Sequence, residues 1–164
     1  MKEKRILFRI RLLITLFITG LVFSGITAFP VKAELSFLVN HVSLFPDIMK
    51  NWLIRVYSAV STVNSDYPFL NYGTDWLAFA HIVIAIAFIG PLREPSRNIW
   101  VIKFGMIACI LVFPLALIAG PIRGIPFWWQ LIDCCFGIFG LIPLIWSYIL
   151  IKKLDALKEQ KTVA

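Results

Sequence analysis

Long apolar stretches alternate with short polar segments along the chain. Four of them are long enough to cross about 30 Å of hydrocarbon at about 1.5 Å per helical residue, namely residues 12–29, 76–92, 99–121 and 127–151. The pattern predicts an all-α integral membrane protein, in which four transmembrane helices form a bundle. We expect residues 1–164 to be one membrane domain, with a charged tail at 152–164.

The segment between the first two apolar stretches has a different periodicity. Between residues 47 and 63 the apolar positions recur at helical spacing, and polar residues take the opposite side. This helix is too short and too polar to span, so we expect an amphipathic helix that lies in the outer interface or caps the bundle. The whole outer segment is predicted at about residues 35–66. A gating or partner-docking role for it is the alternative.

Local signals predict how the apolar helices begin, end and bend. Thr74 or Asp75 is expected to cap the second span, which Gly90 and Pro91 close. Pro114 lies deep in the third span, where a proline removes a hydrogen bond and kinks the helix.

Small and polar residues predict which helix faces turn toward other helices. In the first span Gly20, Ser24 and Ala28 are spaced by four, which favours close helix packing. The fourth span carries a similar stripe at spacings of three and four. Its members are Gln130, Asp133, Gly137, Gly140, Leu144 and Ser147.

The first span could also be a signal peptide. It has a basic start, an apolar core and the small residue Ala33 before Glu34. Its apolar run exceeds the 7 to 15 residues of a signal core. We therefore expect a retained anchor. Cleavage, which would leave three spans, is the alternative.

Composition supports the membrane interpretation. Hydrophobic residues make up 60% of the 164 residues and charged residues only 15%, and the mean hydropathy is +0.85. A soluble domain would be about a quarter charged. Disordered chains, coiled coils and disulfide-stapled secreted proteins are excluded by this apolar excess and by the presence of only three cysteines.

The basic residues predict the orientation. Twelve of the sixteen Lys and Arg precede the first span, flank the junction of the second and third, or follow the fourth. Four crossings place these regions on one side, and the positive-inside rule makes that side cytoplasmic. We expect a bacterial inner-membrane protein with both termini in the cytoplasm. Nucleic acid is not expected as a partner, because no basic stripe is interleaved with aromatics.

Ionisable residues inside spans are the best candidates for chemistry, because even Asp, Lys or Arg at midspan costs about 2.5 to 3.5 kcal/mol to insert in lipid. Asp133 lies near the outer edge of the fourth span and His81 well inside the second. We expect a polar cluster at the outer face that binds a ligand. Its members are His81, Asp133, Arg123 and Asp75, with Tyr72, Trp128 and Trp129 at the rim.

This cluster has a structural alternative. In it, Arg123 pairs with Asp133 or Asp75, His81 donates to a backbone carbonyl, and the cluster only locks the bundle. No catalytic residue, metal ligand set or cofactor is expected. The adjacent Cys134 and Cys135 lack the spacing of a redox pair, and no cluster has zinc-ligand spacing.

These observations predict a class of function and no specific activity. We expect a non-enzymatic membrane component that binds a partner, a lipid or a small ligand. One alternative is a subunit of a small-solute or proton-coupled transporter, and another is a membrane enzyme that uses His81 and Asp133. Beyond the bilayer, the expected partners are further copies of the chain or another membrane protein.

Overall fold

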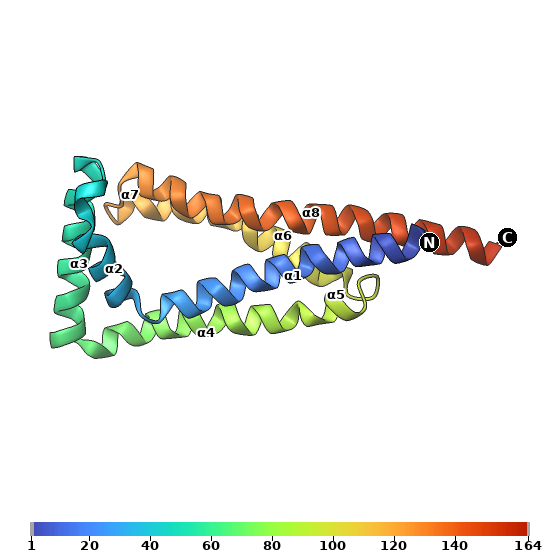
Figure 1. The fold of residues 1–164 in the computed structure, drawn as a ribbon, viewed down its shortest axis with the longest axis horizontal. Helices are drawn as coiled ribbons and strands as arrows, with labels where there is room; N and C mark the ends of the chain where they lie inside the picture. Colours follow the sequence, from blue (N-terminus) through green and yellow to red (C-terminus); the bar gives the residue numbers. More distant parts are fainter. Residues whose placement is uncertain (1, 164) are drawn as a thin grey trace. The chain divides into compact units, whose positions relative to one another are not determined.

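The computed structural model describes the backbone of residues 2–163 and the side chains of residues 3–161, which form helices and no strand (Figure 1). The elements follow in the order α1 (Lys2–Ala28), α2 (Val31–Asn40), η1 (Val42–Leu44), α3 (Asp47–Asp66), η2 (Pro68–Asn71), α4 (Tyr72–Ala87), α5 (Ile89–Arg93), α6 (Ile99–Pro114), η3 (Leu115–Ala119), α7 (Gly120–Ile122) and α8 (Phe127–Val163).

Four helical stretches are long and apolar enough to cross a membrane, which confirms the predicted number. They are Glu3–Ala28, Pro68–Arg93, Ile99–Ile122 and Phe127–Lys161. The charged tail predicted at 152–164 continues α8 without a break as far as the backbone is described.

The chain divides into two compact units. Unit 1 comprises residues 1–20 and 84–164, and unit 2 comprises residues 21–83. The helices α1 and α4 run from one unit into the other. The predicted four-helix bundle and single membrane domain stay predictions.

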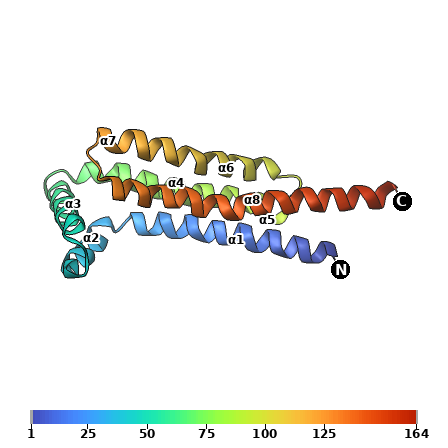
Figure 2. The same ribbon diagram turned by 90° about the horizontal axis from the view of Figure 1, so that it is seen from above.

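In unit 1, glycines bring α6 and α8 close together, side by side as Figure 2 shows. A Cβ atom on Gly137 would lie 2.7 Å from the carbonyl oxygen of Cys109, and one on Gly140 would lie 2.6 Å from its Sγ. Leu144 and Ser147 on the same stripe are fully buried. The stripe therefore turns toward other helices, as predicted.

Two prolines interrupt the helices of unit 1. Pro114 ends α6, and a π-helical turn, η3, follows it. The helix is thus disturbed at Pro114, as the sequence predicts, and the disturbance is a widened turn. Pro91 cannot donate to the carbonyl of Ala87, where α4 ends, and the short α5 follows. The second apolar helix therefore breaks at Phe88, two residues before Gly90.

In unit 2, α2 packs along α3, with Leu35 and Leu53 buried between their neighbours. In this unit α1 contacts α4 closely at Gly25, where a Cβ atom would lie 2.9 Å from the carbonyl oxygen of Ala78. The prediction was wrong for Gly20, which is exposed with no neighbouring atom within 4 Å. Gly25 lies on a different side of the helix from Gly20, because five residues make about 1.4 turns.

The predicted cap of the second apolar helix was also wrong. The 3₁₀ turn η2 runs directly into α4, which begins at Tyr72. Thr74 and Asp75 therefore lie inside the first turns of the helix, where their side chains are free to serve another purpose.

Candidate functional site

The seven predicted ligand-binding residues are divided between the two units. Unit 2 holds Tyr72, Asp75 and His81, all on α4, and unit 1 holds the other four. Those four are Arg123, Trp128, Trp129 and Asp133. The convergence of the two groups stays a prediction.

His81 is half-buried, and its ring is held by its own helix. Its Nδ1 donates to the carbonyl oxygen of Leu77 at 2.8 Å, which requires the proton on Nδ1. Its Cβ lies against α1, 3.3 Å from where a Cβ on Gly25 would be. This backbone hydrogen bond is of the kind that the structural alternative expected.

The structure describes no hydrogen bond or ion pair between His81 and Asp75 over residues 3–161. Six residues make about one and two-thirds helical turns, so the two side chains leave α4 on different faces. Asp75 therefore does not orient the ring of His81 in unit 2.

The members in unit 1 show no ion pair either. Arg123 is exposed just after α7, and Asp133 is half-buried on α8. Among the described side chains they do not approach within the 4 Å of a salt bridge. The rings of Trp128 and Trp129 meet edge to face, 5.4 Å apart. The pairing of Arg123 with Asp133, one version of the structural alternative, is thus not found.

The structure places Asp75 in a cavity of unit 2 that the sequence did not predict. This cavity, which we call the cap cavity, has a volume of about 460 Å³. It is lined by the turn between α1 and α2, one side of α3 and the start of α4. The lining residues are Phe29, Pro30, Val31, Lys32, Ala33, Ser36, Tyr57, Val60, Asn64, Asn71, Thr74 and Asp75.

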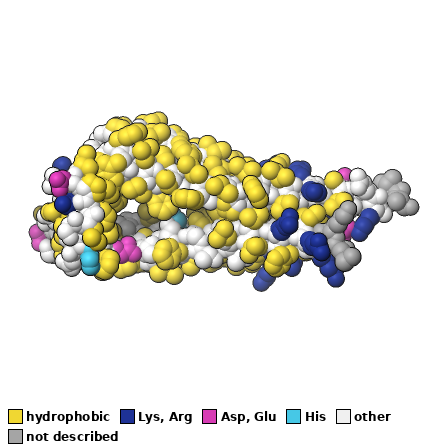
Figure 3. Space-filling view, turned by 45° about the horizontal axis from the view of Figure 1, so that its top comes forward, with side chains coloured by type: hydrophobic (Ala, Val, Ile, Leu, Met, Phe, Trp, Pro, Cys, Tyr) yellow, Lys and Arg dark blue, Asp and Glu magenta, His cyan; other side chains and the backbone are white. Residues whose placement is uncertain are grey.

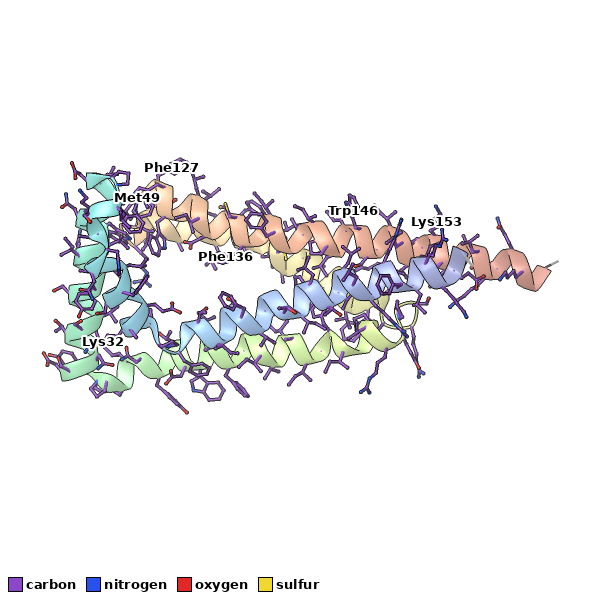
Figure 4. The ribbon with its side chains drawn as sticks, viewed as in Figure 1. Lys32, Met49, Phe127, Phe136, Trp146 and Lys153 are labelled. Carbon is purple, nitrogen blue, oxygen red and sulfur yellow. The ribbon has the colours of Figure 1, made fainter. Side chains whose placement is uncertain are left out.

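Residues at helical spacing line the cap cavity on two helices. Lys32 and Ser36 are four residues apart on α2, and on α3 Tyr57, Val60 and Asn64 are spaced by three and four. Lys32, labelled in Figure 4, belongs to the first turn of α2. Residues at this spacing share a helix face, so the sequence did contain the signal for each wall separately.

A hydrogen bond ties two of these walls together. The side-chain amide of Asn71 donates to the Asn64 side-chain oxygen at 3.2 Å and so joins η2 to the end of α3. This bond fixes where α4 starts relative to α3. Asp75 follows one turn later and faces the cavity from that position.

The cap cavity contains two opposite charges that do not neutralise each other. Lys32 contributes an ammonium group and Asp75 a carboxylate, and no salt bridge within 4 Å joins them in the described part of the chain. Tyr57, Ser36 and Thr74 add neutral hydroxyl groups. The cavity can therefore contact a ligand that carries both charges.

The described residues contain no group of three or more His, Cys, Asp or Glu side chains that could hold a metal ion. Cys109, Cys134 and Cys135 are free thiols. The charged and hydroxyl side chains that line the cap cavity can form hydrogen bonds and ion pairs.

Comparison of the chain with models of protein families, with curated proteins and with solved structures found no match.

Proposed function

We propose that the chain is a non-enzymatic integral membrane protein that binds a small zwitterionic ligand in the cap cavity. The observation that carries the proposal is that Lys32 and Asp75 line one cavity without forming an ion pair. Two unpaired opposite charges suit a ligand with an anionic and a cationic group, because each bond would be charge-assisted. Of the seven residues in the predicted cluster, the proposal retains Asp75. The binding role of the other six residues stays a prediction.

The orientation that we propose puts both termini in the cytoplasm of a bacterium and the cap cavity on the outer side. Two contacts inside unit 1 support it. Lys161 bonds Glu3 at 2.6 Å, and the Ser96 hydroxyl donates to Asp155 at 2.5 Å. These contacts bring the start of α1, the loop before α6 and the end of α8 to one place. The three basic regions of the sequence thus lie near one another in unit 1, which supports a shared side.

The cap cavity is tested by ligand-dependent thermal unfolding of the full chain in dodecyl maltoside. The zwitterionic probes are glycine and O-phosphoethanolamine, and the singly charged or neutral probes are acetate, ethylamine and glucose. We expect a saturable rise in Tm with a zwitterion and a smaller one with the others.

Charge-neutral variants assign the effect to the cavity. Asp75→Asn and Lys32→Gln should each weaken binding about tenfold or more, because each removes a charge-assisted bond of about 1.5–3 kcal/mol. The matched control is Glu34→Gln, since Glu34 is an exposed carboxylate on α2 outside the cavity lining. Absence of binding by every probe, or equal loss in the control, would refute the proposal.

A further inference from the structure

Besides the cap cavity of unit 2, the structure has a cavity of about 410 Å³ in unit 1, where the first turns of α1 meet the last turns of α8. The start of α1, the loop between α5 and α6 and the last turns of α8 line it. Four basic residues, Lys4, Arg93, Arg97 and Lys158, stand in this lining beside the apolar Leu7 and Leu154. We call it the basic cleft. Figure 3 shows the Lys and Arg side chains gathered around this part of unit 1.

The acidic residues of the basic cleft already have partners. Glu3 is bonded by Lys161 at 2.6 Å, and Glu94 lies 3.5 Å from Arg97. Among the described residues, Lys4 and Arg93 form no ion pair. The cleft therefore has an excess of positive charge, and at least two of its cations are available to an anion.

The walls of the cleft are fixed to one another. The Ser96 hydroxyl donates to Asp155 and holds the loop that carries Arg93 and Arg97 against α8. The ion pair between Glu3 and Lys161 holds α1 to the same helix. An anion would thus find cations already assembled from three segments, which lowers the entropic cost of binding.

Apolar and aromatic surface adjoins the cleft. Phe8 on α1 is 68% exposed and Trp100 on α6 is 65% exposed, each within a few residues of a lining residue. Trp146, about two turns before Leu154 on α8, points outward in Figure 4 and is also exposed. Exposed tryptophan together with basic residues is typical of helix ends at the headgroup level of a membrane.

We infer that the basic cleft binds the phosphate of an anionic phospholipid, with the acyl chains along the adjoining apolar surface. A lipid uses both features, the cations and the exposed apolar residues. A soluble phosphate would use only the first. The inference concerns residues that do not line the cap cavity and does not depend on the zwitterion proposal.

Native mass spectrometry of the full chain in detergent tests this inference. The probes are dioleoylphosphatidylglycerol, dioleoylphosphatidylcholine and soluble glycerophosphoglycerol. We expect at least tenfold more bound phosphatidylglycerol than phosphatidylcholine at equal concentration. We also expect no displacement by equimolar glycerophosphoglycerol. Equal binding of the two lipids, or displacement by the soluble compound, would overturn the inference.

Variants assign the lipid to the cleft. The double variant Lys4→Gln/Arg93→Gln should bind phosphatidylglycerol about thirtyfold more weakly, and each single variant about fivefold. The matched control is Lys152→Gln/Lys153→Gln, which removes the same charge from exposed positions of α8 outside the cleft. An equal loss of phosphatidylglycerol binding in the control would show that the lipid is attracted by the overall surface charge and not by the basic cleft, which would refute the inference. Circular dichroism verifies folding, and the single variants decide the question if the double variant does not fold.

Discussion

At the residue scale, glycines allow close contacts between helices, because they have no side chain to keep the backbones apart. Gly25 and Gly137 each face a backbone carbonyl of another helix at a distance that no Cβ atom tolerates. Gly20 faces nothing within 4 Å. The same residue type thus has opposite roles in one chain, depending on what the neighbouring helix places against it.

Gly137→Ala should destabilise the protein by about 1–3 kcal/mol, because its new methyl group would lie 2.7 Å from the Cys109 carbonyl oxygen, and backbone cannot move aside cheaply. Gly20→Ala is the matched control and should be neutral or stabilising by up to about 1 kcal/mol, since alanine favours the helix. Thermal unfolding in detergent, followed by circular dichroism at 222 nm, measures both. Equal effects of the two substitutions would contradict the close packing of α6 and α8.

His81→Ala and His81→Leu should both cost less than about 1 kcal/mol, because the one hydrogen bond of the ring among the described residues goes to the Leu77 carbonyl of its own helix. The two losses of stability should be similar. The transporter and enzyme hypotheses predict a different result, in which transport or turnover is lost while Tm is unchanged. Measuring Tm and glycine binding in parallel also tests whether His81 belongs to the ligand site.

At the element scale, α3 is held in unit 2 by one buried anchor. Leu53 is 2% exposed, while its neighbour Ile54 is 47% exposed. Trp52, Val56 and Val60 on the same side are half-buried. The remaining surface of α3 is exposed in unit 2, and the sequence predicts that it faces the outer membrane interface.

Leu53→Ala should cost about 2–5 kcal/mol and release α3 from α2. Ile54→Ala is the matched control and should change stability much less, because most of its side chain is already exposed. Limited proteolysis around Tyr67, the residue between α3 and η2, compared with thermal unfolding, separates local release from global loss. Equal sensitivity of both variants would show that the packing of α3 is not centred on Leu53.

At the scale of the whole molecule, the proposed orientation puts Asn51 of α3 outside the cell and Gln160 of α8 inside. Both side chains are exposed. In a background with the three native cysteines replaced by alanine, Asn51→Cys should react with an impermeant maleimide in right-side-out vesicles. Gln160→Cys should react only in inverted vesicles, and so should Arg5→Cys near the other terminus.

Labelling of Arg5→Cys and Gln160→Cys from opposite sides would contradict four crossings. It would also conflict with the ion pair between Glu3 and Lys161. Labelling of Asn51→Cys and Gln160→Cys from the same side would refute the external position of α3.

The sequence by itself determined the helical class, the four long apolar helices and the buried stripe of α8. These follow from local quantities, because hydropathy and spacings of three and four act within a single helix. The buried stripe that ends at Ser147 and the helix over residues 47–63 are examples.

Only the tertiary structure decided which faces meet. The cap cavity needs a lysine from α2, an aspartate from α4 and a wall from α3, and nothing in the spacing of any one helix specifies the other two. The same holds for Gly25, because its close contact depends on the Ala78 carbonyl oxygen of another helix. Contacts between distant segments depend on the path of the loops and on packing, which periodicity does not encode.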